Sequence, residues 1–319
     1  MMLNILSGGL QTSIQDGGRS GWMRYGVAPG GAADPVAMAM ANQLVGNTPA
    51  AACLEVTLVG PKIQFEEELC LAVCGARFDL SLNNMPIGND TGIQVHPGDI
   101  LDFGALRSGA RAYLAISADI RVPSVFDSQA TQLQVGLGGF RNRALQTGDR
   151  IPLCNRRVPV TRQLPVEFRL NYRGRPQLRV IEGAEATYFT AQDRERFAST
   201  TYEVSPQSNR MGIRLEATPF DTSELPQMTS SGLCPGTIQV PPSGQPIVSF
   251  VEAQTIGGYP RIGHVIEADQ HLLGQLKPRD RINFTPVALD IAHQLLREKH
   301  ALLAQLPARL DKAIHPTSM

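Results

Sequence analysis

Short apolar runs that alternate with polar residues, separated by turns rich in Gly and Pro, dominate the chain. Residues 247–251 are such a run, with Pro- and Gly-rich loops before and after it, and this composition is typical of a β-strand. Residues 96–103, 146–153 and 277–284 resemble one another, because each places an Asp in a tight turn before an alternating segment. The pattern predicts a mainly β protein built from related turn-and-strand modules.

Helical signals are few. Residues 34–46 begin with Asp-Pro and end with Gly, which are typical helix start and stop signals. A second helix is expected at 190–198. A third is expected from Thr285-Pro286 to Pro307, because Leu289, Ala292, Leu295 and Leu296 fall along one helical stripe.

The chain of 319 residues is long enough for two domains. Between 156 and 179 lie seven arginines and three prolines but a single acidic residue, Glu167, which favours a linker. A solvated connector and a docking strip for an acidic partner are both compatible with this composition. The predicted division is an N-terminal β domain at 1–155, a linker at 156–180, a C-terminal β domain at 181–284, and a helix with a tail at 285–319.

Charge and cysteine content narrow the function classes. The formal net charge is zero and the pI is about 7, so nothing global indicates nucleic acid or an anionic membrane as partner. No apolar run approaches the length of a membrane helix, and a cytoplasmic protein is expected. The five cysteines are expected to be buried free thiols of a reducing compartment, at Cys53, Cys70, Cys74, Cys154 and Cys234.

Several ordered motifs between Leu3 and Phe284 resemble the family of 5-oxoprolinase C subunits, also described as biotin-dependent carboxyltransferases, allophanate hydrolase subunit 2 or kinase-inhibitor antagonists. They stand at 11–19, 31–34, 41–47, 54–58, 109–115, 208–215, 238–246 and 254–260. The chain departs from the family at Ala118-Asp119, where Gly-Gly is usual, at 127–131, and at Ile256, where Thr is usual. These departures bear on the subfamily activity more than on the fold.

The resemblance implies two cyclophilin-like β-barrel domains and a complex with two further proteins, the A and B subunits, that cleaves 5-oxoproline to glutamate with ATP. An unstrained lactam is a poor electrophile, and phosphorylation of its oxygen would activate it. The sequence has no Gly-rich loop ending in Lys-Ser or Lys-Thr. ATP is therefore expected on a partner, with no cofactor bound by this chain and little activity when it is isolated.

Four residues are predicted to be catalytic, namely Arg210, Gln254, Tyr259 and Asp34. Arg210, flanked by Ser208 and Asn209 as substrate contacts, would clamp a carboxylate, and a structural ion pair is the alternative. Tyr259 would donate a proton, although a tyrosine before Pro is commonly a packed turn residue. Asp34 would be a general base, but its place at a helix start also explains it.

The remaining candidates would hold the amide edge of the substrate. Gln239, Gln254 and Thr255 would hydrogen-bond this edge, with loop stabilisation as the alternative. Gly257-Gly258 would present backbone amides to an oxyanion, or form a plain turn. Arg19 would line the same cleft, or lie exposed in a Gly-rich turn.

Other chemistries find less support. The histidines lack zinc-ligand spacing, so no metal site is expected. No Ser or Cys is accompanied by His and Asp in the pattern of a catalytic triad. One alternative is carboxyl transfer from carboxybiotin to a urea-like amide, with the biotin carried by another protein because Ala-Met-Lys-Met is absent. Another is a non-catalytic protein that binds and antagonises a kinase inhibitor.

Overall fold

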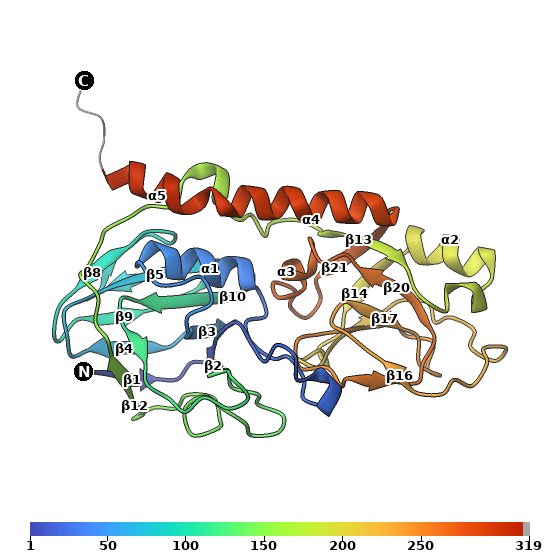
Figure 1. The fold of residues 1–319 in the computed structure, drawn as a ribbon, viewed down its shortest axis with the longest axis horizontal. Helices are drawn as coiled ribbons and strands as arrows, with labels where there is room; N and C mark the ends of the chain where they lie inside the picture. The colour runs from blue at the N-terminus through green and yellow to red at the C-terminus, as the bar shows by residue number, and fades with distance from the viewer. Residues whose placement is uncertain (315–319) are drawn as a thin grey trace. The chain divides into compact units, whose positions relative to one another are not determined.

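The computed structural model describes residues 1–314, with side chains through residue 310, and divides into two compact units (Figure 1). The first unit contains Met1–Arg19, Gly30–Tyr172 and the segment that begins at Leu303. The second contains Ser20–Pro29 and Arg173–Leu302. Each unit is built mainly from strands, so the prediction of a mainly β chain with two β domains and few helices is confirmed.

Two sheets form the first unit. One is seven-stranded, in the order β11-β12-β1-β4-β9-β6-β7, and the other is five-stranded, in the order β2-β3-β10-β5-β8. The bounds of the strands are β1 Met2–Ser7, β2 Gln11–Gln15, β3 Cys53–Thr57, β4 Lys62–Phe65, β5 Leu69–Phe78, β6 Ser81–Leu82, β7 Met85–Pro86, β8 Ile93–Val95, β9 Ile100–Asp102, β10 Leu106–Ile116, β11 Asp119–Ile120 and β12 Arg150–Cys154.

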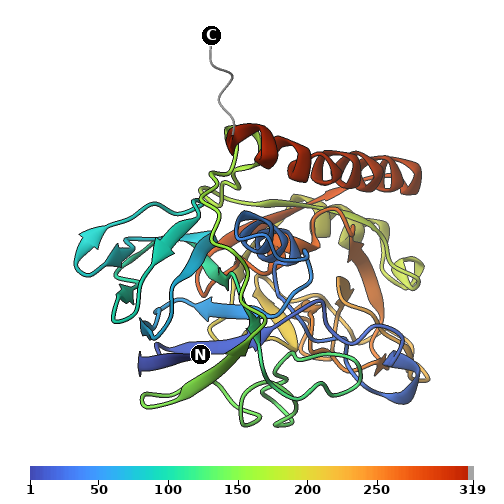
Figure 2. The same cartoon turned by 60° about the vertical axis from the view of Figure 1, so that its left-hand side comes forward.

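The five-stranded sheet is covered on both faces. Helix α1 (Pro35–Leu44) packs on β5 and β10, as two views of the ribbon show (Figures 1 and 2). The inner face of the same sheet shares a core with Leu3, Ile5 and Ile63 of the other sheet. Because both faces of β5 are buried, its sequence is a nearly continuous apolar run instead of an alternating one.

The helix signals in the sequence were largely correct. The Asp34 side chain caps α1 by accepting from the Ala37 amide at 2.9 Å, and Thr190 caps α2 (Ala191–Ser199). The third predicted helix is wrong at both ends, because Thr285 and Pro286 are the last residues of β21 (Arg281–Pro286) and Pro307 does not stop the helix. Instead α4 (Leu289–Ala304) ends first, and Pro307 lies in the first turn of α5 (Leu306–Ile314), where a missing amide proton costs nothing. Residues 315–319 of the predicted tail lie outside the described part.

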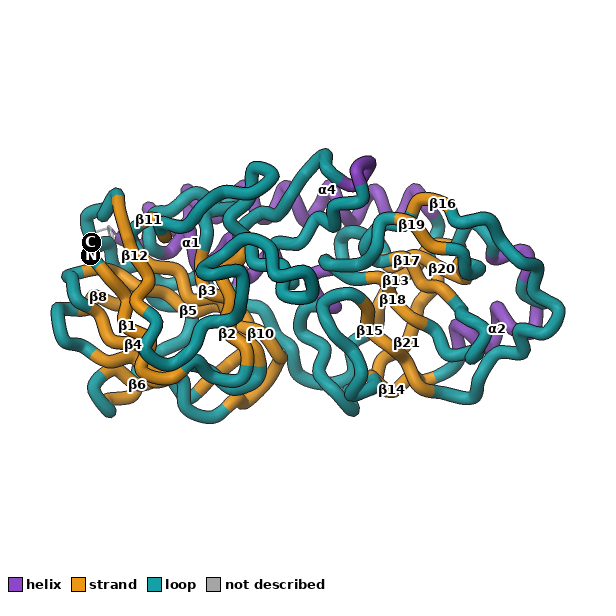
Figure 3. Tube along the Cα trace, turned by 90° about the horizontal axis from the view of Figure 1, so that it is seen from below, coloured by secondary structure: helices purple, strands orange, loops and turns teal. Residues whose placement is uncertain are grey.

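The second unit is a closed barrel in the order β13-β20-β17-β18-β15-β14-β21 (Figure 3). A short pair, β16 and β19, forms a separate two-stranded sheet, and the helices of this unit also include α3 (Gln270–Leu273). The strand bounds are β13 Gln177–Glu182, β14 Thr201–Val204, β15 Gly212–Glu216, β16 Ser231–Gly232, β17 Thr237–Gln239, β18 Ile247–Ser249, β19 Ile256–Gly257, β20 Arg261–Val265 and β21 Arg281–Pro286. Short 3-10 turns occur at η1 Met23–Tyr25, η2 Val166–Phe168 and η3 Ala186–Tyr188.

Side chains alternate between the barrel interior and its outer face. Ile213, Val248 and Ile238 are cross-strand neighbours on β15, β18 and β17, and each is at most 2% exposed. The residues that alternate with these three along their strands therefore point outward. Arg214 and Gln239 are two such outward positions.

The segment predicted as a linker contributes to the first unit. Leu164 and Phe168 are buried with residues of α1, and the Gly92 amide donates to the Arg162 carbonyl at 2.6 Å. The division between the units falls after Tyr172, within the predicted 156–180 segment. Apolar side chains inside an Arg-rich stretch were the available signal for this packing.

The three similar segments form the tight turns that their sequences predicted, and these turns share one hydrogen-bond pattern. In each, the Asp amide donates to the carbonyl three residues earlier, at 3.0 to 3.1 Å. Each Asp carboxylate also accepts from the amide of that same earlier residue, at 2.8 Å for Asp99 and Asp149 and 3.1 Å for Asp280. The turn thus closes locally before β9, β12 and β21 begin.

One of these turns carries backbone strain that a substitution should relieve. The residue before the Asp has positive φ in all three turns, at Gly98, Gly148 and Arg279, whose φ is 70°. An L-amino acid at positive φ destabilises the folded state by about 1 to 2 kcal/mol. Glycine removes this strain but loses more conformational entropy on folding, which offsets part of the gain. Arg279→Gly should therefore raise the free energy of unfolding by about 0.5 to 1 kcal/mol in urea titrations.

The matched control is Gly148→Ala, whose Cβ would meet nothing within 4 Å. Its cost would come from the backbone alone, at about 1 to 2 kcal/mol. A destabilised Arg279→Gly protein would show that the arginine side chain contributes more than its backbone conformation costs.

Candidate functional site

A small pocket lies on the outer face of the second barrel, beside the loops that frame β18. Cross-strand pairing sets Arg214 opposite Ile247, Ile247 opposite Gln239, and Gln239 opposite Arg261. The pocket has a volume of about 180 Å³, smaller than the ~300 Å³ at which pockets for drug-sized ligands begin. Its size suits a compact metabolite.

The structure brings four of the eleven predicted site residues together around this pocket. They are Asn209, Gln239, Gln254 and Tyr259. The other lining residues are Met211, Gly212, Arg214, Leu233, Ile247, Ser249 and Ala253. An apolar floor with three side-chain amides, one phenol and one guanidinium is suited to a ligand that has both an amide and an acid group.

Gln239 is the most buried of the three amides. Its side chain is 6% exposed, and its Nε2 donates to the Tyr259 carbonyl at 3.2 Å. Among the described residues no donor reaches its Oε1. This oxygen can therefore accept from a ligand N–H.

Gly257 leaves room for the Gln239 amide. A Cβ built on Gly257 would lie 2.7 Å from Gln239 Nε2, which is closer than real contacts allow. Gly257→Ala should displace the amide and raise KM for the substrate about tenfold, the effect of losing roughly one hydrogen bond. The measurement is steady-state kinetics of the complex that the family resemblance implies.

Gly232→Ala is the matched control, because Gly232 lies in the partner strand and a Cβ there would meet nothing within 4 Å. If both alanine variants keep the wild-type KM, Gln239 does not position the substrate.

Arg214 is the charged residue of the pocket and was not predicted. It stands between buried Ile213 and Leu215 on β15, so the strand alternation points it outward. Its guanidinium has no ion-pair partner in the part of the chain that the structure describes. The sequence signal was this alternation, which places Arg214 on the face that Gln239 also occupies.

Arg210, predicted to be the carboxylate clamp, has a different environment. Its Nε donates to Glu252 Oε1, and the two side chains are 4% and 0% exposed. The Glu252 amide also donates to the Arg210 carbonyl at 2.8 Å. This position is that of a buried ion pair, the alternative weighed for it, and Arg210 does not line the pocket.

Ser208 and Asn209 shape the turn that enters β15. Ser208 Oγ accepts from the Arg214 amide at 3.0 Å, and Asn209 Oδ1 accepts from the Met211 amide at 2.8 Å. Both contacts set the backbone that carries Arg214. Thr255, also predicted, accepts through its carbonyl from the Leu233 amide at 2.8 Å, which ties the loop after β18 to the loop before β17.

Gly257 and Gly258 do not form the expected anion nest. Gly257 pairs with Ser231 in the short β16–β19 ladder, and neither glycine has positive φ. A nest needs successive residues of alternating helical hand. Because glycine has no side chain, Gly257 instead lets the Gln239 amide lie close to the backbone, and Gly258 lines a neighbouring groove.

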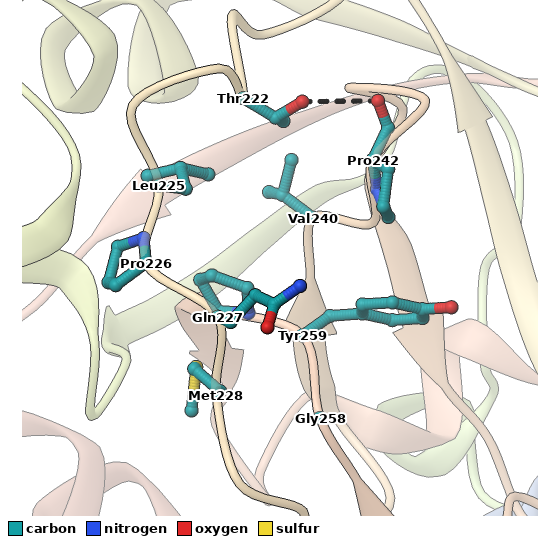
Figure 4. A pocket seen from close by; sticks show the side chains of 10 residues that line it. Thr222, Leu225, Pro226, Gln227, Met228, Val240, Pro242, Gly258 and Tyr259 are labelled. Carbon is teal, nitrogen blue, oxygen red and sulfur yellow. Dashed lines mark hydrogen bonds between the residues drawn. The ribbon is translucent and has the colours of Figure 1, made fainter.

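That groove lies on the other side of Tyr259. Its volume is about 340 Å³, and Leu225, Pro226 and Met228 form one wall (Figure 4). The ring of Tyr259 extends away from this wall, and its side chain is 43% exposed. Tyr259 thus lines both hollows and can orient toward a ligand in either.

Asp34 and Arg19 belong to the first unit. Asp34 is fully buried, with Oδ1 accepting from the Ala37 amide and Oδ2 accepting from the Tyr172 hydroxyl at 2.6 Å. Helix capping therefore accounts for it, as the alternative predicted. Arg19 is also fully buried and donates to the Ala130 carbonyl at 2.6 Å, so it is not an exposed turn residue.

The described residues show neither a metal cluster nor a membrane helix. Within residues 1–310, no three His, Cys, Asp or Glu side chains come together as metal ligands would. None of the described helices is long and apolar enough to cross a bilayer.

Comparison with known proteins shows which family the chain belongs to. A family model described as "Carboxyltransferase domain, subdomain A and B" matches residues 25–286, most of the chain. The chain belongs to this carboxyltransferase family. The resemblance inferred from the motifs is thereby confirmed.

Relatives of two kinds share this family. The chain is 36% identical to the 5-oxoprolinase C subunit of Escherichia coli, over 97% of this chain and 99% of that protein. It is 31% identical to the Haemophilus influenzae protein of the same name, over 98% and 99%. It is also 32% identical to urea amidolyase of Lachancea kluyveri, over 95% of this chain but 18% of that protein.

Solved structures agree on the carboxyltransferase fold. The urea carboxylase of Kluyveromyces lactis superposes with a TM-score of 0.89 at 28% identity, covering 99% of this chain and 30% of that protein. The K. lactis urea amidolyase gives 0.88 at 28% identity, covering 96% of this chain and 20% of that protein. This chain therefore corresponds to one part of those longer enzymes.

Proposed function

We propose that this protein is the C subunit of an ATP-dependent 5-oxoprolinase and acts with the A and B subunits to convert 5-oxo-L-proline to L-glutamate. The observation that carries the proposal is the match to the E. coli 5-oxoprolinase C subunit over nearly the full length of both chains. The urea amidolyase match covers only a fraction of a much longer protein. The pocket on the barrel face supplies the chemistry that such a substrate needs.

The substrate is a five-membered lactam that carries a carboxylate. The guanidinium of Arg214 would bind the carboxylate as a two-pronged donor. Gln239 Oε1 would accept from the lactam N–H, while Gln254, an exposed residue of the same rim, would donate to the lactam carbonyl. These contacts place the carbonyl carbon in a fixed orientation on an apolar floor that includes Ile247 and Ala253.

The groups that line this pocket do not favour ATP as its ligand. A triphosphate requires several backbone amides or cationic side chains, whereas the pocket offers one guanidinium within about 180 Å³. We therefore assign nucleotide binding to a partner protein of the complex. In the assembly ATP would supply activation of the lactam carbonyl, and this chain would bind and orient the ring and stabilise charge that develops on the carbonyl oxygen.

The test is reconstitution of the three proteins with each omitted in turn, measuring glutamate released from 5-oxoproline and ATP hydrolysed. Release should require this chain, and avidin should leave it unchanged. Undiminished release without this chain would contradict the proposal.

Two other outcomes identify the alternatives. Avidin-sensitive carboxylation of urea would indicate the biotin-dependent transferase. Tight binding of a partner without any turnover would indicate the kinase-inhibitor antagonist.

A further inference from the structure

One cysteine departs from the expectation of buried thiols. All five cysteines are unpaired in disulfides, and Cys53, Cys70 and Cys74 are buried as predicted. Cys154 is partly buried, whereas Cys234 is exposed, in the turn between β16 and β17. Its surroundings contain polar and basic groups.

A chain of hydrogen bonds runs from His264 to Cys234. Thr237 and His264 are direct cross-strand partners on β17 and β20. Thr237 Oγ1 lies 3.2 Å from His264 Nδ1 and 3.5 Å from Cys234 Sγ. The three side chains therefore form a continuous relay on the outer face of the barrel.

Gln270 lies beside this relay. Its Nε2 donates to the Pro235 carbonyl at 3.2 Å and to the Val265 carbonyl at 3.3 Å, and it also lies 3.5 Å from His264 Nε2. The Thr237 hydroxyl lies between His264 Nδ1 and Cys234 Sγ, and it can donate its proton to the sulfur.

These neighbours favour the thiolate. The hydrogen bond involving His264 lowers the pKa of the Cys234 thiol below its ordinary value, and Thr237 and the Arg261 guanidinium act in the same direction. Arg261 is in turn paired with Glu185. By contrast, burial raises the pKa of the Cys53 and Cys74 thiols.

We propose that Cys234 is a nucleophilic thiolate that accepts a small disulfide such as oxidised glutathione, and that the adduct closes the neighbouring pocket. The thiolate attacks one sulfur of the small disulfide, a new S–S bond forms to Cys234 Sγ, and the old S–S bond breaks. The leaving thiolate takes the electron pair of the broken bond. A reducing thiol reverses the exchange.

The position of the thiol explains why an adduct would close the pocket. Leu233, adjacent to Cys234, lines the pocket. Thr237 stands two residues before Gln239 on β17, so both side chains point to the same face, about 7 Å apart along the strand. We therefore expect a tripeptide-sized adduct on Cys234 to cover Gln239. This second half of the proposal rests on the proposed function, whereas the reactivity of the thiol does not.

The first experiment measures the rate of iodoacetamide labelling at Cys234 and Cys154 by peptide mass spectrometry, from pH 5.5 to 9.5. Cys234 should react about tenfold faster than Cys154 at pH 6.5, with a midpoint below that of an ordinary thiol. Thr237→Val, which keeps the side-chain shape but breaks the relay, should move the midpoint upward, and His264→Asn should do the same. If the pH midpoint of Cys234 labelling in the unsubstituted protein equals that of an ordinary thiol, the proposal is overturned, regardless of the results for the variants.

The second experiment treats the assembled complex with oxidised glutathione and measures glutamate release before and after dithiothreitol. Release should fall at least several-fold, recover on reduction, and be insensitive in Cys234→Ser, whose basal rate should equal that of the unsubstituted protein. Adduct formation on Cys234 with unchanged release would refute closure of the pocket. If the complex shows no glutamate release at all, the proposed function fails while the labelling result still decides the reactivity.

Discussion

Arg214→Ala should raise KM for 5-oxoproline about 10- to 100-fold in the assembled complex, with a smaller change in kcat. The physical reason is the loss of a charge-assisted, two-pronged contact to the substrate carboxylate, worth roughly 1.5 to 3 kcal/mol. Arg214 lines the pocket and its guanidinium is not engaged by a carboxylate of the described residues. Steady-state kinetics with varied 5-oxoproline at saturating ATP is the measurement.

Two variants sharpen this prediction. Arg214→Lys keeps the charge but loses the planar fork, and should fall between the parent and the alanine variant. Arg281→Ala is the matched control, because Arg281 makes an exposed ion pair with Glu203 and lines none of the described hollows near the site. Equal KM values for Arg214→Ala and Arg281→Ala would remove Arg214 from the site.

Arg210→Ala should lower the free energy of unfolding by about 3 to 5 kcal/mol, because it leaves the Glu252 carboxylate buried without its partner. Urea unfolding followed by circular dichroism measures this loss. Arg281→Ala is again the control and should cost at most about 1 kcal/mol, since its pair is exposed. The double variant Arg210→Met with Glu252→Leu should recover much of the stability.

The clamp interpretation of Arg210 makes a different prediction. It expects turnover to fall while the protein stays as stable as its parent. Comparing kcat and KM of the folded fraction with the unfolding curve separates the two. An Arg210→Ala protein with unchanged stability and lost turnover would contradict the structural role.

Local sequence patterns predicted the elements whose stabilisation is itself local. The Asp-containing turns at 99, 149 and 280 and the Asp34 cap close their hydrogen bonds within a few residues, so their motifs suffice. Pro307 shows the limit of such rules, because proline is equally compatible with stopping one helix and starting another. The sequence does not say which applies.

The site was predictable in part for the same reason. The two Gly- and Pro-framed loops around β18 were identified, and Gln239, Gln254 and Tyr259 meet at one pocket. The sequence did not reveal that Arg210 is paired, because its partner Glu252 lies 42 residues away and no local pattern connects the two. The alternation of β15 did distinguish the two arginines, since it directs Arg214 outward between buried neighbours.

Long-range packing also explains the remaining differences. Leu164 and Phe168 lie in an Arg- and Pro-rich stretch whose composition favours a solvated connector, yet they are buried with residues of α1. Cys234 differs in the opposite sense, because a cysteine in a strand-rich chain is expected to be buried but here stands in an exposed turn. In both cases the outcome depends on contacts between segments far apart in the sequence.

A crystal structure of the assembled complex with 5-oxoproline would test the central claim most directly. We predict that the ligand lies on the outer face of the second barrel, with its carboxylate on Arg214 and its lactam N–H on Gln239 Oε1. Ligand density elsewhere, with this pocket filled only by solvent, would contradict the account.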